Sequence, residues 1–135
     1  MPASKPYLQS ADVKKILAAA EAHALKNGWA VHIVVVDDGG HALGALRLDG
    51  ATPMVSLIAA EKARVAALSR RETVFYETMI NQGRSAFLSA PLDGFIEGGV
   101  PVIIDGQCAG AVGVSGVKSD QDAEIAKAGI AALAG

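Results

Sequence analysis

Two copies of one pattern constrain the fold of this chain more than any other feature: a strand, a turn of Asp and Gly residues, and a returning strand. The first copy spans residues 30–48 and turns at residues 37–40. The second spans residues 100–116 and turns at Asp105-Gly106. Asp-Gly pairs readily adopt the backbone conformations that a tight hairpin requires. The sequence therefore predicts two β-hairpins that lie far apart along the chain.

Helical segments surround the two hairpins. Apolar residues recur at helical spacing in residues 11–27, 53–68 and 73–82, and again in the segment that follows Ser119. Each segment follows a Ser or Thr residue that we expect to be its N-cap: Ser10, Thr52, Thr73 and Ser119. Residues 84–99 are expected to be a loop. This order predicts an α+β fold in one domain over residues 1–135, with an antiparallel sheet of two hairpins flanked by helices in three layers.

Composition limits the kinds of partner that the chain can have. The net charge is −2, which argues against nucleic acid, because phosphate binding requires a basic surface. The single cysteine, Cys108, cannot form an internal disulfide. No apolar stretch follows the polar first six residues, and the longest apolar runs are too short to cross a bilayer. We therefore expect a cytoplasmic protein without membrane contact.

Five short motifs occur in an order that is typical of one known family. They are VVVDDGGHAL at residues 34–43, RLDGA at 47–51, EKA at 61–63, GGVPV at 98–102, and GAVGVSG at 110–116 followed by QD at 121–122. Together they resemble the motifs of the GlcG/HbpS family, which includes the C-terminal domain of PduO-type corrinoid adenosyltransferases. The resemblance covers residues from about 8 to 134.

The resemblance implies a profilin-like fold and a dimer-based homo-oligomer, such as a tetramer or an octamer. Some members of the family bind haem, some accompany corrinoid enzymes, and others are encoded with glycolate or aromatic catabolism. One residue departs from the family: where it commonly has Thr in a KAxTA motif, this chain has Val65. Valine keeps the shape of threonine and loses its hydroxyl group, so the pocket chemistry and ligand preference of the relatives do not carry over directly to this chain.

Charged residues near these motifs are candidates for a ligand site. Arg47 and Asp49 point to the same face at the end of a predicted strand, and Lys62 lies on the following predicted helix. Arginine can bind a carboxylate through two hydrogen bonds, and lysine adds a compact charge, so these residues favour an organic anion. The alternative is a structural Arg–Asp pair together with a lysine whose stem packs on the core.

Glycines leave backbone uncovered at or within the second predicted hairpin. Gly98 and Gly99 precede it, and three further glycines lie within residues 110–116. Their N–H groups could hold an anion, or the missing side chains could allow tight packing of a helix or a second subunit. The predicted ligand site combines the candidates of both kinds: Arg47, Asp49, Lys62, Gly98, Gly99 and Ser115.

The histidines supply one candidate for a cofactor ligand. His23 lies near the buried stripe of the first predicted helix, and it is the candidate axial ligand if the protein binds haem. The alternative is a histidine held by the last carbonyl groups of its own helix. His32 and His41 are not spaced as metal ligands, and no carboxylate or cysteine cluster joins them, so no metal site is predicted.

Three functions remain open at the level of sequence. The first is a small-molecule-binding accessory protein that holds haem, a corrinoid-related molecule or another organic anion in a glycine-lined pocket of a homo-oligomer. The second is a small catabolic enzyme that acts on an oxo or hydroxy acid by proton transfer. The third is a scaffold without a ligand. The candidate bases for the enzyme are Asp37, Asp49, Glu61 and Asp122.

Overall fold

A four-stranded antiparallel sheet forms the centre of the computed structural model, which describes residues 2–134. The strand order is β2-β1-β4-β3. The bounds of the strands are His32–Asp37 for β1, Ala42–Arg47 for β2, Gly99–Ile104 for β3 and Gln107–Ser115 for β4. Strands β1 and β2 form one hairpin, β3 and β4 form the other, and pairing of β1 with β4 joins the two. Both predicted hairpins are therefore confirmed.

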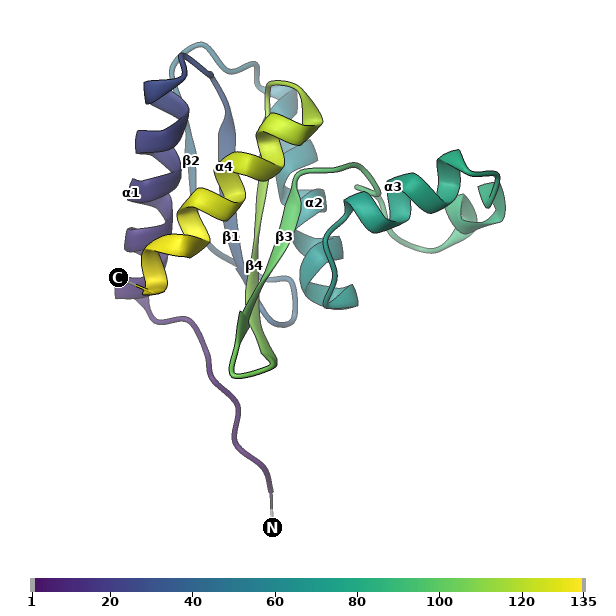
Figure 1. Cartoon of the computed structure of the whole chain (residues 1–135), viewed down its shortest axis with the longest axis horizontal. Helices are drawn as coiled ribbons and strands as arrows, with labels where there is room; N and C mark the ends of the chain where they lie inside the picture. The colour runs from purple at the N-terminus through teal and green to yellow at the C-terminus, as the bar shows by residue number, and fades with distance from the viewer. Residues whose placement is uncertain (1, 135) are drawn as a thin grey trace.

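Helices cover both faces of the sheet, as Figure 1 shows. Helices α1 (Ser10–Lys26) and α4 (Ser119–Ala131, followed by the short 3-10 helix η2 at Ala132–Ala134) pack together on one face. Helix α2 (Met54–Ser69) covers the opposite face. Helix α3 (Val74–Asn81) and the 3-10 helix η1 (Ser85–Ser89) form an arm that projects away from these layers. The predicted α+β fold is confirmed.

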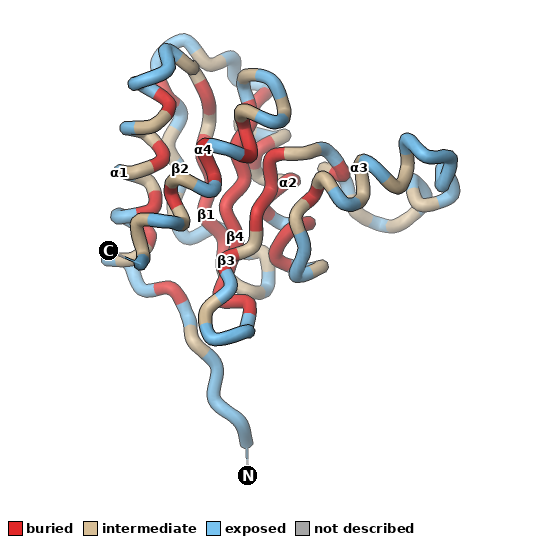
Figure 2. Tube along the Cα trace, viewed as in Figure 1, coloured by how far each residue is buried: buried red, intermediate tan, exposed pale blue. Residues whose placement is uncertain are grey.

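The two faces of the sheet are packed with side chains of different size. Branched aliphatic residues such as Ile16, Ile33 and Ile125 fill the space beneath α1 and α4. The α2 face is built mainly from alanine, with two valines of β1 added: Ala59, Ala63, Ala66, Ala67, Ala111, Val34 and Val36. Buried residues run along the middle of β1 and along β4 after its exposed first residue in Figure 2. Small side chains therefore let α2 approach the sheet closely.

Two glycines mark the points of closest approach between α2 and the sheet. A Cβ atom at Gly113 would overlap the carbonyl oxygen of Ala59, and one at Gly99 would overlap the carbonyl oxygen of Lys62. Backbone atoms cannot move aside as a flexible side chain can. Of the two roles considered for these glycines, the structure supports tight packing of a helix on the sheet.

Three of the four predicted N-caps are wrong by one residue. Helix α1 begins at Ser10 and its N-cap is Gln9, whose backbone N–H donates to the Asp12 carboxylate at 2.8 Å. A side chain at the third helical position thus starts the helix one residue early. Likewise Lys118, rather than Ser119, is the N-cap of α4. Pro53, rather than Thr52, is the N-cap of α2.

The segment 84–99 is more ordered than the predicted loop. It contains η1, and its aromatic side chains pack back onto α3. The ring of Tyr76 stacks on that of Phe87 with centroids 5.2 Å apart, and Phe95 lies 5.0 Å from Phe87. These rings give the arm a small core of its own. No helix among residues 2–134 is long and apolar enough to cross a membrane.

Candidate functional site

Lys62 is buried, although the sequence predicted that it would face an anion. Its side chain is only 2% exposed. The Nζ atom donates to Asp122 Oδ2 at 3.0 Å and to the carbonyl oxygen of Val114 at 3.0 Å. The other oxygen of Asp122 accepts a hydrogen bond from the N–H of Val117 at 3.1 Å. The lysine therefore binds a carboxylate of its own chain and ties α2 to α4.

The ionisation of Asp122 reflects this environment. Burial raises the pKa of the Asp122 carboxyl, and the charge of Lys62 and its hydrogen bond oppose the rise. The side chains of both partners are 2% exposed. Two buried charges of opposite sign depend on one another, because either of them alone would be left in a medium that solvates it poorly.

The predicted glycines lie directly against Lys62. A Cβ atom at Gly98 would lie 2.8 Å from the Nζ atom of Lys62, so the side chain of the lysine fills the space that the glycine leaves. Ser115 is buried at the end of β4, next to Val114. The structure therefore places Gly98 and Gly99 against Lys62, and Ser115 directly follows the residue whose carbonyl oxygen Lys62 binds.

Arg47 and Asp49 lie apart from that cluster. Both are exposed, at the end of the edge strand β2 and in the turn that follows it. Strand pairing places Arg47 beside His32, and His32 beside Ser115, in one row across the sheet. Burial lowers the pKa of His32, and the charge of Arg47 lowers it further. The Nδ1 atom of His32 is buried and has no hydrogen-bond partner within residues 2–134.

His23 already has a partner. Its Nε2 atom lies 2.6 Å from Glu124 Oε2, and its ring lies 6.1 Å from that of Trp29. The structure thus gives this nitrogen a carboxylate of α4, which differs from the open position expected of an axial haem ligand. No group of three or more His, Cys, Asp or Glu side chains among the described residues could hold a metal ion.

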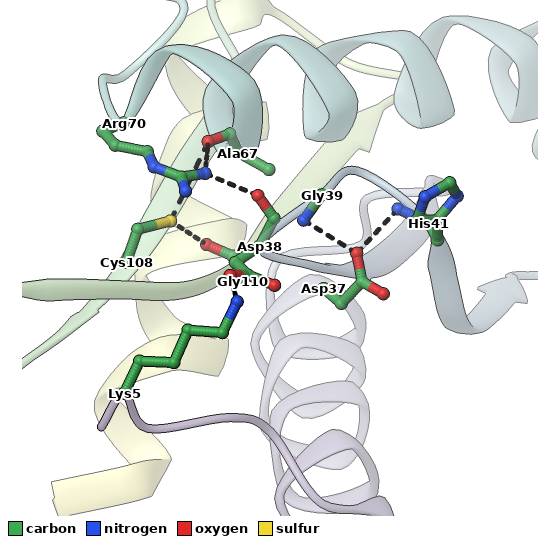
Figure 3. Close-up of polar contacts among 9 residues, drawn as sticks. All are labelled: Lys5, Asp37, Asp38, Gly39, His41, Ala67, Arg70, Cys108 and Gly110. Atoms are coloured by element: carbon green, nitrogen blue, oxygen red, sulfur yellow. Dashed lines mark hydrogen bonds and ion pairs between the residues drawn. The ribbon is translucent and has the colours of Figure 1, made fainter. Parts of the chain in front are cut away.

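The Asp/Gly turn between β1 and β2 is fixed by its own acidic residues, as Figure 3 shows. Asp37 Oδ1 accepts hydrogen bonds from the N–H groups of Gly39 and His41, at 2.9 and 3.0 Å. The guanidinium of Arg70 donates to the carbonyl oxygen of Asp38 and, at 2.6 Å, to that of Ala67. Asp37 therefore shapes the turn, and the turn is fastened to the end of α2.

The other candidate bases lie in separate places. Glu61 is on the outer side of α2, Asp49 follows β2, and Asp122 is buried against Lys62. No two of the four predicted bases, Asp37, Asp49, Glu61 and Asp122, are hydrogen-bonded to one another within residues 2–134. The structure does not assemble them into one site.

The corner between α2 and α3 holds a cavity of about 730 Å³, which lies within the range of ligand pockets. Its lining is mixed: Arg70, Arg71, Glu72, Val74, Phe75, Thr78, Met79, Gln82 and Pro101. The guanidinium carbon of Arg71 lies 4.4 Å from the centroid of the Phe75 ring. Glu72 pairs with Lys127 of α4 at 3.2 Å, whereas Arg71 has no ion-pair partner among residues 2–134. An unpaired cation and an exposed aromatic ring thus share one open cavity.

The shape of this corner depends on the backbone at Arg70. Arg70 adopts a left-handed conformation, with φ of 60°, and ends α2 there. The chain then turns into the arm, so α3 forms one wall of the cavity and Pro101 of β3 another. Neither Arg70 nor Arg71 is among the site residues predicted from the sequence. The signal that could have found the site is the pair of arginines directly before an amphipathic helix that carries Phe75.

Comparisons with known proteins place the chain in a family. The family model described as "Haem degrading protein HbpS-like" matches residues 8–131. Protein GlcG of Escherichia coli is 53% identical over 112 residues, which are 83% of this chain and 84% of that protein. The chain belongs to the HbpS-like family. This confirms the resemblance that the five motifs indicated.

Solved structures of HbpS and of a PduOC protein have the same fold as this chain. A double mutant of HbpS from Streptomyces reticuli superposes with a TM-score of 0.87 at 32% identity, covering 98% of this chain and 90% of that one. A PduOC protein solved as a complex with haem superposes with a TM-score of 0.84 at 26% identity, covering 94% and 95%. The whole antiparallel sheet and its helices are therefore shared with these proteins.

The HbpS-like family makes haem the group to test against the α2–α3 cavity. The unpaired guanidinium of Arg71 suits a carboxylate such as a haem propionate, and the face of Phe75 suits a flat apolar ring. Of the usual axial ligands of haem iron, the lining offers only the thioether of Met79, because no histidine, cysteine or tyrosine lines the cavity. The residues present fit a flat organic anion, and they do not fit a haem iron held by histidine.

Proposed function

We propose that this HbpS-like protein binds a small organic anion with a flat apolar body in the cavity between α2 and α3, and that it does so as a homo-oligomer. The observation that carries the proposal is the guanidinium of Arg71, which lies over Phe75 without a carboxylate partner in the described chain. An arginine in this position can bind a carboxylate through two parallel hydrogen bonds, while the ring of Phe75 contacts the body of the ligand.

The charges around the cavity favour an anion. Arg70 and Arg71 are both part of its lining, and the acidic Glu72 is neutralised by Lys127 at 3.2 Å. The net charge of the lining is therefore positive. Val74, Met79 and Pro101 supply the apolar surface that a hydrocarbon body requires. A ligand with only a charge, or only an apolar body, would use half of the site.

Haem, corrinoid-related molecules and aromatic acids share this chemistry, since each joins a flat or apolar body to polar side groups. The haem complex of the PduOC relative supports haem as the first compound to test, with a propionate placed on Arg71. The role is an accessory one of binding. Glu72 is the only carboxylate of the lining, and it is already paired with a lysine.

The proposal is tested by titrating the purified protein with haemin and with 2-naphthoate, and by comparing Arg71→Ala with Arg47→Ala. Both arginines are exposed, but only Arg71 lines the cavity. We expect saturable binding to the wild type, about tenfold weaker binding to Arg71→Ala, and unchanged binding to Arg47→Ala. Equal affinities for wild type and Arg71→Ala, or no binding of either compound to the wild type, would contradict the proposal.

A further inference from the structure

One side of α3 lines the α2–α3 cavity from one end of the helix to the other. Thr78, Met79 and Gln82 follow Phe75 by three, four and seven residues, so the four side chains lie on the same side of the helix. Gln82 is the C-cap of α3, and Arg71 lies just before the helix begins. The cavity therefore runs along α3, with Arg71 at one end and Gln82 at the other.

The two ends of the cavity are about two helical turns apart. Gln82 lies seven residues beyond Phe75, and each residue advances an α-helix by about 1.5 Å, so the separation along the axis is about 10 Å. The guanidinium carbon of Arg71 lies 4.4 Å from the centroid of the Phe75 ring. A ligand whose carboxylate binds Arg71, and whose flat body follows α3, therefore brings its opposite edge toward Gln82.

Neutral polar groups line the end of the cavity that lies far from Arg71. The Thr78 hydroxyl and the Gln82 amide are exposed, and neither takes part in a side-chain hydrogen bond within residues 2–134. They are four residues apart and so lie on neighbouring turns of one helix face. Each of them can both donate and accept a hydrogen bond. This end therefore offers a ligand hydrogen bonds and no countercharge.

The polarity of the helix adds to the difference between the two ends. Aligned peptide dipoles leave the N-terminus of a helix partly positive and its C-terminus partly negative. In α3 the positive end lies near Arg71 and the negative end lies at Gln82. Arg84, the next basic residue along the chain, does not line the cavity. A second carboxylate at Gln82 would therefore be disfavoured, whereas a hydroxyl that donates a hydrogen bond would be favoured.

We propose that the ligand of this cavity is a flat organic acid with a neutral hydrogen-bonding group, such as a hydroxyl, at the edge opposite its carboxylate. The inference rests on the proposed binding at Arg71 and adds Gln82 and Thr78 as the residues that select among flat acids. The Gln82 amide binds the hydroxyl, with Thr78 beside it, and Met79 contacts the body of the ligand. An acid without the hydroxyl leaves the amide without a partner in the complex, and a diacid places a charge where no cation meets it.

Three acids with the same fused ring test the inference: 2-naphthoate, 6-hydroxy-2-naphthoate and 2,6-naphthalenedicarboxylate. Calorimetric titration of the wild type should show about fivefold tighter binding of the hydroxy acid than of 2-naphthoate, as expected for one additional hydrogen bond. The dicarboxylate should bind more weakly than the hydroxy acid. Equal affinities for 2-naphthoate and the hydroxy acid, or tightest binding of the dicarboxylate, would overturn the inference and leave the proposed site at Arg71 standing.

Variants of similar size assign the preference to Gln82. Gln82→Met removes the amide and keeps the length of the side chain. It should weaken binding of the hydroxy acid about fivefold and change the affinity for 2-naphthoate by less than about twofold. Thr78→Val should have a smaller effect in the same direction. Asn81→Leu is the matched control and should change neither affinity, because Asn81 is exposed next to Gln82 but does not line the cavity.

Thermal unfolding shows that each of these variants is folded. A preference for the hydroxy acid that persists in Gln82→Met, or an equal loss of affinity for both acids in that variant, would show that Gln82 does not select the ligand. A wild type that binds none of the three acids would overturn the proposed site together with this inference.

Discussion

The surroundings of Lys62 and of Arg71 show how burial decides what a basic residue can do. Both residues belong to or follow α2, and both lie near glycine or aromatic residues that could border a ligand. Lys62 is 2% exposed and holds Asp122, whereas Arg71 is exposed in an open cavity and has no acidic partner among residues 2–134. The closed region is therefore a structural joint between two layers, and the open corner is available for a ligand.

Breaking the buried pair of Lys62 and Asp122 should reduce stability more than any other change proposed here. Lys62→Met should lower the free energy of unfolding by about 3–5 kcal/mol, because it leaves the buried Asp122 without its counter-charge. The double variant K62M/D122L should regain much of that loss, since it removes both charges. Urea unfolding of the three proteins measures this. If Lys62→Met alone is as stable as the wild type, the pair is not a structural joint.

A second change probes the close approach of α2 to the sheet. Gly113→Ala should lower the free energy of unfolding by about 3 kcal/mol, since the new methyl group would overlap the carbonyl oxygen of Ala59 in the backbone of α2. Gly106→Ala is a control for backbone strain without overlap, because a Cβ atom at Gly106 meets no atom within 4 Å and only its positive φ of 76° opposes the change. Thermal unfolding of both variants measures the difference. A larger loss at Gly106 would show that packing of α2 is not the cause.

A change in the open corner should affect binding and leave stability almost intact. Arg71→Ala should weaken binding of 2-naphthoate about tenfold and change the free energy of unfolding by less than about 0.5 kcal/mol, as is usual for an exposed side chain. Arg71→Lys keeps the charge and loses the planar guanidinium group. Its affinity for 2-naphthoate should therefore lie between those of the wild type and Arg71→Ala. Calorimetric titration and urea unfolding measure both quantities. A stability loss as large as that of Lys62→Met would remove the contrast between the two regions.

The smallest expected effect concerns pH and His32. Burial and the charge of Arg47 hold the pKa of His32 below its ordinary value of 6.5, so the unfolded chain binds more protons than the folded one just below that pH. The contribution of this group to stability is complete above pH 6.5 and is lost as the pH falls toward the lowered pKa. His32→Gln should flatten this part of the profile of stability against pH, and Arg47→Ala should flatten it partly. Equal slopes in all three proteins would contradict the assignment.

Much of the fold follows from local sequence signals. The turns at residues 37–40 and 105–106 and the apolar periodicity of the helices gave the correct elements, because turn conformation and amphipathicity are properties of neighbouring residues. The N-cap of α1 was misplaced by one residue, because the side chain of Asp12, three positions further on, decides where the helix starts.

The candidate site was harder to predict, because it depends on contacts between distant residues. Lys62 lies on an apolar stripe, and only the fold shows that its ammonium group is hydrogen-bonded to Asp122, which is 60 residues away in the sequence. The cavity at Arg71 depends on the left-handed backbone of Arg70, which a non-glycine residue seldom adopts and which no turn motif announced. The sequence therefore pointed to basic residues, but only their burial in the fold shows that Lys62 is structural and that Arg71 is open to a ligand.

The proposed binding of the ligand at Arg71, and not at the buried lysine, separates the two regions. It is tested most directly by measuring the affinity for one ligand, 2-naphthoate or haemin, in Arg71→Ala and in the double variant K62M/D122L under the same conditions. We expect the double variant to bind as the wild type does and Arg71→Ala to bind about tenfold more weakly. Normal binding by Arg71→Ala together with lost binding by a folded double variant would contradict it.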